Sequence, residues 1–271
     1  MFDEFWHGRL RRPFRLSFQR FGHGSKALVL LHGIASDCTF WQPLVKVLSE
    51  DEFTIFVPDL LGHGDSPKPD YIEYTTTDQA KAVVQMLRKQ GIHECILVGH
   101  SMGSLVATRV ATTLPQRVAR LLLYEPPLFA AIPEFKTRSR RQKFYVDMYE
   151  RIAKNPAGLL TVTRVVATIS RNWTKFLVSE QAWLPIERSL RNTIINQTSI
   201  EELKDIAIQT DIVHGRLDAV VPRSGLRKSL KHNQNIKFYK TTDNHGISPR
   251  SARYLAGLIA PEATLRQNRK Q

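Results

Sequence analysis

Short apolar runs alternate with longer amphipathic stretches in the first half of the chain. Three of these runs, at 27–31, 53–57 and 95–98, are apolar except for Thr54, which is typical of strands buried on both faces of a sheet. A similar run follows at 118–124. The stretch 15–21 alternates polar and apolar residues instead, and this pattern predicts a half-exposed strand.

Helices are predicted between these strands. One covers about 41–48, after the first continuous apolar run. A second begins at Thr76, which forms a capping box with Gln79 three residues later, and it ends at Gly91. Strands and helices that alternate at such short intervals favour right-handed βαβ crossovers, so we expect an α/β fold with a mostly parallel sheet.

The alternation stops near residue 128 and returns near residue 206. The stretch 128–205 is rich in charge and has helical patterns without a clear strand. The candidate helices cover 138–154, 158–170, 173–180 and 187–196. Strand patterns return at 210–215 and 235–240. We therefore predict one core domain, built from residues 1–127 and 206–271, with residues 128–205 inserted as a helical region.

The composition favours a cytoplasmic globular protein. A chain of 271 residues can bury a full core without disulfides, and Cys38 and Cys95 are expected as small buried thiols, with no metal site. No uncharged apolar stretch reaches the ~18–20 residues of a membrane span. The acidic and aromatic start does not resemble a secretory signal peptide.

The chain is strongly basic. It has 39 Lys and Arg residues against 25 Asp and Glu residues, a formal net charge of +14. Because net charge governs solubility and loose association, we expect the excess to lie on solvated faces. No nucleic-acid-binding motif accompanies it, so no specific nucleic-acid partner is expected. A weak association with anionic surfaces stays open as the alternative.

Residues 99–103, Gly-His-Ser-Met-Gly, lie between a predicted strand and a predicted helix. A serine between two glycines at such a junction is typical of a nucleophile elbow, a strained turn that lifts the serine hydroxyl out of the sheet. The neighbours must be small because a larger side chain would meet the adjoining strand or helix. Ser101 is therefore the candidate nucleophile.

Two loops downstream of Ser101 offer the base and the acid that a serine nucleophile requires. Asp218 follows the strand at 210–215, and His245 follows the last predicted strand. Both lie at strand ends, where open α/β sheets build their sites. Glu125 also ends a strand and stays as the alternative acid.

A serine nucleophile also needs N–H donors for the oxyanion of its tetrahedral intermediate. The backbone N–H of Met102 directly follows the nucleophile, and that of Ile34 lies in the loop after the strand at 27–31. We expect these two groups to form the oxyanion hole.

With these motifs together, the chain resembles the α/β-hydrolase superfamily over nearly its whole length. The matching motifs are His32-Gly33, Asp59-x-x-Gly62-x-Gly64-x-Ser66, Gly99–Gly103, Gly215-x-x-Asp218-x-x-x-Pro222 and His245-Gly246. The resemblance implies a sheet of about eight strands with flanking helices, and a helical cap over the site at 128–205. Trp173, Phe176 and Trp183 of that cap are candidate substrate-pocket residues.

The resemblance also narrows the activity. Dehalogenases and epoxide hydrolases of this superfamily carry Asp at the nucleophile position, so Ser101 excludes them. C–C bond hydrolases, thioesterases, acylglycerol lipases and cofactor-free haloperoxidases stay open. By analogy with small capped members we predict a carboxylesterase that needs no cofactor and acts on a small-molecule ester or acyl substrate. The alternative outside the enzymes is a small-molecule receptor with slow turnover.

Overall fold

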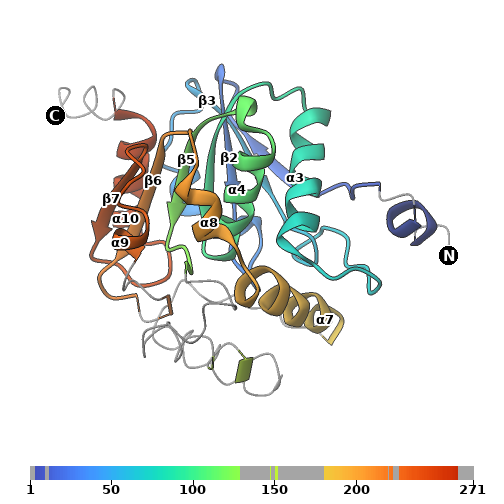
Figure 1. The fold of residues 1–271 in the computed structure, drawn as a ribbon. Coiled ribbons are helices and arrows are strands. Elements are labelled where there is room, and N and C mark those ends of the chain that lie inside the picture. The colour runs from blue at the N-terminus through green and yellow to red at the C-terminus, as the bar shows by residue number, and fades with distance from the viewer. Residues whose placement is uncertain are drawn as a thin grey trace.

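The chain forms an α/β fold around one twisted sheet (Figure 1). The computed structural model describes residues 4–9, 12–128, 147, 150–151, 180–218, 220–221 and 226–261. These residues contain seven strands, in the order β1-β3-β2-β4-β5-β6-β7. All neighbouring strands are parallel except β1, which runs antiparallel to β3. The predicted fold class is confirmed, with seven strands in the described part of the chain where about eight were expected.

The strands and helices follow the predicted alternation. The strands are β1 (Phe18–Phe21), β2 (Lys26–Leu31), β3 (Phe53–Pro58), β4 (Cys95–His100), β5 (Val118–Tyr124), β6 (Thr210–Gly215) and β7 (Ile236–Thr241). The α-helices are α2 (Gln42–Val45), α3 (Thr76–Lys89), α4 (Met102–Thr113), α7 (Glu180–Ser189), α8 (Ser199–Lys204), α9 (Leu226–Ser229) and α10 (Pro249–Ile259). Short helical turns are η1 (Phe5–Arg9), η2 (Cys38–Trp41), η3 (Pro115–Arg117) and η5 (Leu190–Ile195).

Two hydrophobic clusters cover the two faces of the sheet. Along β2, Val29 and Leu31 face the cluster that includes α3, α4 and α8, while Leu28 and Leu30 face the cluster that includes α2 and α10. This alternation follows from the two-residue period of a strand. Figure 1 shows α3, α4 and α8 in front of the strands. Burial on both faces explains why residues 27–31 of β2 and 95–98 of β4 are all apolar.

The capping box of helix α3 lies one residue before the predicted one. The N-cap is Thr75, whose side chain accepts a hydrogen bond from the N–H of Asp78, and Asp78 in turn accepts from the N–H of Thr75. The predicted pair of Thr76 and Gln79 is therefore wrong. The Gln79 side chain is buried and instead bonds both the N–H and the C=O of Leu61, so it fixes the loop that follows β3.

Other local predictions differ from the structure. The helix expected at 41–48 is the turn η2 followed by the single turn of α2. The helix expected at 187–196 begins earlier, as α7, and continues into η5. Cys95 is buried as expected, but Cys38 is half-buried.

The described part of the predicted insertion packs on the core at the carboxyl end of the sheet. Arg188 of α7 donates to the carbonyls of Asp70 and Ile72, and Thr193 of η5 donates to the carbonyl of Tyr74. Helix α8 packs against α4. The helices expected at 158–170 and over most of 138–154 and 173–180 lie outside the described residues, and the domain division at 128 and 205 stays a prediction.

Candidate active site

Ser101 stands in a strained turn between β4 and α4. Its backbone has φ 50° and ψ −122°, a conformation that non-glycine residues rarely adopt. The N–H of Ser101 donates to the carbonyl of Tyr124 at 3.0 Å. A Cβ atom at Gly99 would lie 2.4 Å from the carbonyl oxygen of Gly103, and one at Gly103 would lie 2.4 Å from that of His32. The two glycines of the elbow are therefore required by packing.

The structure brings the three predicted side chains together. His245 Nε2 lies 2.9 Å from Ser101 Oγ, and His245 Nδ1 lies 2.7 Å from Asp218 Oδ2. All three residues are at least nine-tenths buried. A histidine held between a serine hydroxyl and a carboxylate is the geometry of an activated serine nucleophile.

Asp218 is fixed as a hydrogen-bond acceptor. Its Oδ1 atom accepts from the N–H groups of Val220 and Val221, at 2.6 Å and 3.2 Å. Burial alone would raise the pKa of this carboxyl, but the charge of His245 and hydrogen bonds from His245, Glu125 and Val220 hold it well below its usual value. Asp218 is therefore held as a carboxylate that orients the imidazole of His245.

The loop after β2 approaches the elbow at the predicted oxyanion position. A Cβ atom at Gly33 would lie 3.0 Å from Ser101 Cβ, so the loop that carries Ile34 passes directly beside the nucleophile. Met102 is the first residue of α4, and the first N–H groups of a helix have no partner within it. Both N–H groups can therefore face an oxyanion next to Ser101.

The buried side chain of Asp59, which the sequence analysis noted only as part of a motif, holds these loops in place. Asp59 accepts from the N–H of Cys38 at 2.7 Å and from the N–H of Asp65 at 2.8 Å. A Cβ atom at Gly64 would lie 2.2 Å from the Asp59 carboxylate. Through Asp59, the motif Asp59-x-x-Gly62-x-Gly64-x-Ser66 thus ties together the loops that follow β2 and β3.

Two further residues that sequence reasoning missed fix the loop that carries His245. His100 Nε2 lies 2.8 Å from the carbonyl oxygen of His245, and the hydroxyl of Tyr124 donates to the carbonyl of Gly246 at 2.7 Å. The His100 ring stacks on Phe40, with centroids 4.1 Å apart. The only sequence signal was their position, because both residues end a strand beside the nucleophile.

The remaining candidates lie at different places. Glu125 accepts from the N–H of Gly215 and lies beside Asp218, while the carboxylate that accepts from His245 Nδ1 is that of Asp218. Trp183 is half-buried in α7. Trp173 and Phe176 lie outside the described residues.

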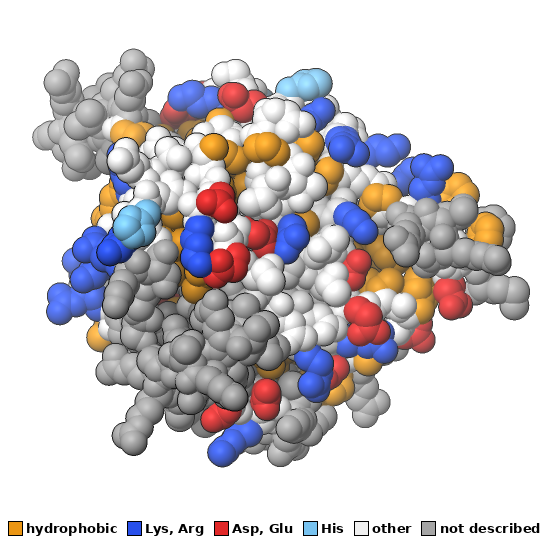
Figure 2. Space-filling model, in the orientation of Figure 1, with side chains coloured by type: hydrophobic (Ala, Val, Ile, Leu, Met, Phe, Trp, Pro, Cys, Tyr) orange, Lys and Arg blue, Asp and Glu red, His pale blue; other side chains and the backbone are white. Residues whose placement is uncertain are grey.

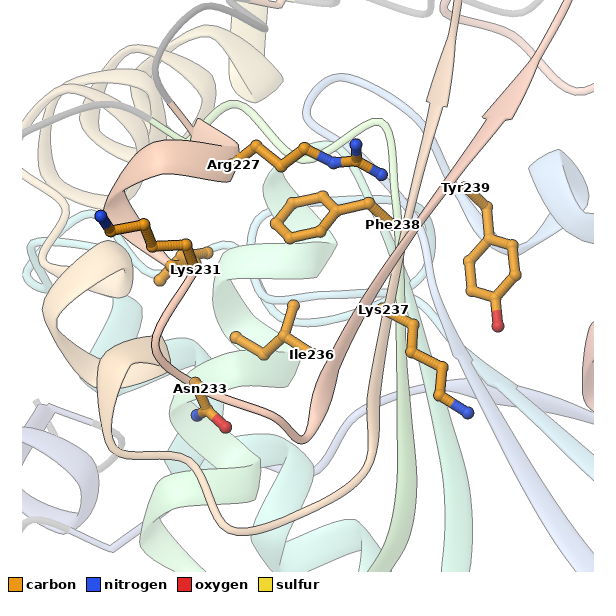
Figure 3. Close-up of a pocket in the computed structure, with 8 residues that line it drawn as sticks. Arg227, Lys231, Asn233, Ile236, Lys237, Phe238 and Tyr239 are labelled. Carbon is orange, nitrogen blue, oxygen red and sulfur yellow. The ribbon is translucent and has the colours of Figure 1, made fainter.

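A separate pocket of about 460 Å³ lies between α9 and β7 (Figure 3). Arg227 covers the ring of Phe238 at 5.5 Å, and Lys231 and Lys237 are the other charged residues of the lining. The lining contains neither Ser101 nor His245, so this pocket is distinct from the candidate active site.

Charged side chains of one sign do not gather into one patch on the face drawn in Figure 2. Lys and Arg are scattered there, with Asp and Glu between them. Within the described ranges, no group of three or more His, Cys, Asp or Glu residues is arranged to hold a metal ion. The same ranges contain no helix that is long and apolar enough to cross a membrane.

Comparison with known sequences identifies relatives that share part or most of the chain. An uncharacterized protein of Mycobacterium tuberculosis is 39% identical over 117 residues, which are 43% of this chain and 32% of that protein. The match thus spans about a third of that relative. A pimeloyl-[acyl-carrier protein] methyl ester esterase of Vibrio parahaemolyticus is 28% identical over 240 residues, covering 84% of this chain and 90% of the relative.

Solved structures share the architecture. An esterase from Exiguobacterium antarcticum superposes with a TM-score of 0.75 at 17% identity, over 91% of this chain and 94% of that one. At this identity the likeness concerns the fold alone. The family model of the alpha/beta hydrolase fold matches residues 26–246, from the start of β2 to the loop of His245. With this match, and with the sheet and elbow described above, the chain belongs to the α/β-hydrolase family.

Proposed function

We propose that this α/β hydrolase is a serine esterase that cleaves small carboxylic esters through an acyl-enzyme. The observation that carries the proposal is the continuous chain of contacts from Asp218 through His245 to Ser101, at 2.7 Å and 2.9 Å. In this arrangement Ser101 is the nucleophile, His245 the general base and Asp218 the acid that orients it.

The mechanism follows from these positions. His245 Nε2 takes the proton of Ser101 as the hydroxyl oxygen attacks the ester carbonyl carbon. The N–H groups of Ile34 and Met102 stabilise the oxyanion of the tetrahedral intermediate. His245 then gives its proton to the leaving alcohol, and a water activated by the same base hydrolyses the acyl-enzyme and restores Ser101.

An ester is favoured as the substrate class by the relatives. The esterase of Vibrio parahaemolyticus aligns over most of both chains, and its name describes a methyl ester substrate. Thioesters share the acyl-transfer step, and a thioesterase domain is among the solved structures with this fold. We place thioesters second because that likeness is at 19% identity.

The test compares the wild-type protein with Ser101→Ala on a chain-length series of p-nitrophenyl esters. We expect turnover by the wild type and a loss of about 10⁴-fold or more in kcat for the variant, with an unchanged Tm. A fluorophosphonate probe should label the wild type at Ser101. Full ester hydrolysis by Ser101→Ala would refute the assignment, and rapid labelling of the wild type without turnover would favour the receptor.

A further inference from the structure

A second carboxyl group lies buried beside the proposed acid. Glu125 directly follows β5 and has no exposed surface. Its backbone has φ 50°, in the left-handed region that non-glycine residues adopt rarely and that clusters at functional sites. Ser101, in the elbow, and Ala35, in the loop after β2, also have a positive φ. The strain at Glu125 thus belongs to the same end of the sheet as the nucleophile.

Glu125 contacts both ends of the turn that carries Asp218. Its Oε1 atom accepts from the N–H of Gly215, and its side chain is hydrogen-bonded to that of Asp218. The turn is closed by the N–H of Asp218, which donates to the carbonyl of Gly215 at 3.3 Å. A Cβ atom at Gly215 would lie 2.5 Å from Glu125 Oε1, so any side chain at position 215 would collide with this carboxyl group.

Two buried carboxyl groups in contact cannot both be ionised, because the repulsion has no solvent to screen it. Asp218 is the one stabilised as an anion, since His245 and two N–H groups converge on it. Among the described residues, the other ionisable groups near Glu125 are Tyr124, Asp243 and His214, whose Nδ1 lies 3.6 Å from Glu125 Oε2. At 3.6 Å, His214 Nδ1 lies beyond hydrogen-bond distance of Glu125 Oε2, so we assign the shared proton to Glu125.

We propose that Glu125 is a positioning residue whose neutral carboxyl group accepts from Gly215 and donates to Asp218. It thereby fixes the carboxylate that orients His245. The inference rests on the proposed roles of Ser101, His245 and Asp218. It also explains why a strand-end glutamate that the sequence offers as an acid is fully buried next to another acid.

The test replaces Glu125 in two ways. Glu125→Gln keeps a group that accepts from Gly215 and donates to Asp218, so kcat for a p-nitrophenyl ester should stay within about threefold of the wild type. Glu125→Leu keeps the size and removes both hydrogen bonds, so kcat should fall by at least about tenfold while KM is unchanged. The rate of Ser101 labelling by a fluorophosphonate should fall in parallel. Glu202→Gln, which removes a carboxylate from the Arg109 ion pair on α8, is the control and should keep the wild-type kcat.

Equal losses in Glu125→Gln and Glu125→Leu would overturn the proposal, because they would show an ionised Glu125. Wild-type kcat in folded Glu125→Leu would also overturn it. Should Glu125→Leu not fold, Glu125→Gln decides alone. A kcat within about threefold of the wild type then supports the proposal, and a loss of about tenfold or more overturns it. Infrared difference spectra of the wild type minus Glu125→Gln report the protonation state of Glu125 directly and do not depend on enzyme activity. We expect the C=O band of a protonated carboxyl group, shifted in D₂O, and its absence would refute the proposal even if the protein proves not to be an esterase.

Discussion

Three histidines around the candidate site are held neutral by burial. Burial lowers the pKa of His32 to about 4 and that of His63 to about 3, and it also lowers the pKa of His100 well below its usual value. Each ring is used as a neutral hydrogen-bonding group: His32 accepts from the N–H of Leu60, and His63 Nδ1 lies 2.9 Å from the carbonyl oxygen of Leu61. The rings of His32 and His63 thus belong to loops near Ser101, and that of His100 ends strand β4 beside it.

This burial predicts a stability that falls in mild acid. The folded pKa of each ring lies below its unfolded value near 6.5, so the unfolded state binds more protons as the pH drops through about 6.5. For one such group the free energy of unfolding should fall by about 1.4 kcal/mol per pH unit between pH 6 and pH 4.5. His63→Asn keeps a donor for Leu61 but cannot titrate, so its slope should be smaller by that amount. Urea unfolding at several pH values measures it, and an unchanged slope would contradict the assignment of a neutral His63.

The role of Asp218 predicts that its substitution lowers kcat far more than substitution of Asp243, which lies close to His245 in the sequence. Asp218→Asn keeps the shape but favours the wrong tautomer of His245, so we expect kcat to fall by about 10³- to 10⁴-fold. Asp243 lies two residues before His245 and accepts from the hydroxyl of Ser248 instead. For Asp243→Asn, kcat should change by less than about threefold. Steady-state kinetics on one p-nitrophenyl ester decides it, and similar losses in the two variants would refute Asp218 as the orienting acid.

At the scale of elements, the junction of β4, β2 and α4 depends on glycines that face backbone atoms. A Cβ atom at Gly103 would lie 2.4 Å from the carbonyl oxygen of His32 and 2.5 Å from that of Leu31. Neither backbone atom can rotate away as a flexible side chain could. Any larger residue must therefore push α4 away from β2 and move the elbow with it.

Gly103→Ala should therefore reduce both stability and activity. We expect a loss of about 2–3 kcal/mol in the free energy of unfolding and about 10²-fold in kcat, since small displacements of a nucleophile are costly. Gly91→Ala is the matched control, because Gly91 has φ 65° but open space around its Cβ position. It should cost about 1 kcal/mol of stability and leave kcat unchanged. Equal effects of the two variants in thermal unfolding and kinetics would show that packing at the elbow is not the constraint.

Much of the element order was predictable from the sequence, because burial on both faces leaves a direct mark on a parallel strand. Most residues of β2, β3, β4 and β5 are apolar, so the sequence shows these strands as short apolar runs. Ser101, Asp218 and His245 were predictable as candidates because each follows a predicted strand. Helix boundaries were less accurate, since the cap of α3 at Thr75 depends on which of three consecutive threonines has extended backbone angles.

The contacts that hold the site together could not be predicted from the sequence. His100 and Tyr124 act on the loop of His245 across more than 100 positions of the chain. Glu125 looked like a competitor of Asp218, because the pattern shows which residues end a strand and not which hydrogen bonds they accept. Such tertiary contacts require the register between β4, β5 and β6, which only the assembled sheet supplies.

At the scale of the whole molecule, a largely buried ion pair joins β5 to β6. Arg120 of β5 donates through Nε to Asp211 of β6 at 2.8 Å, and through a terminal nitrogen to the carbonyl of Leu258 in α10 at 2.5 Å. The Asp211 side chain is fully buried, and that of Arg120 is 18% exposed. The pair therefore connects a strand before residue 128 with a strand and a helix after residue 205.

This connection predicts a non-additive pair of substitutions. Arg120→Met leaves Asp211 buried without its counter-charge, so we expect the free energy of unfolding to fall by about 3–5 kcal/mol. Asp211→Leu in the same chain removes the stranded charge, and the double variant should recover most of that loss because an apolar pair of similar volume packs in its place. Urea unfolding of the wild type, both single variants and the double variant gives the coupling energy. A double variant as unstable as the sum of the two single variants would contradict this account. The ester kinetics of the double variant should match the wild type, since the pair lies away from Ser101 and acts by holding β5, β6 and α10 in one core.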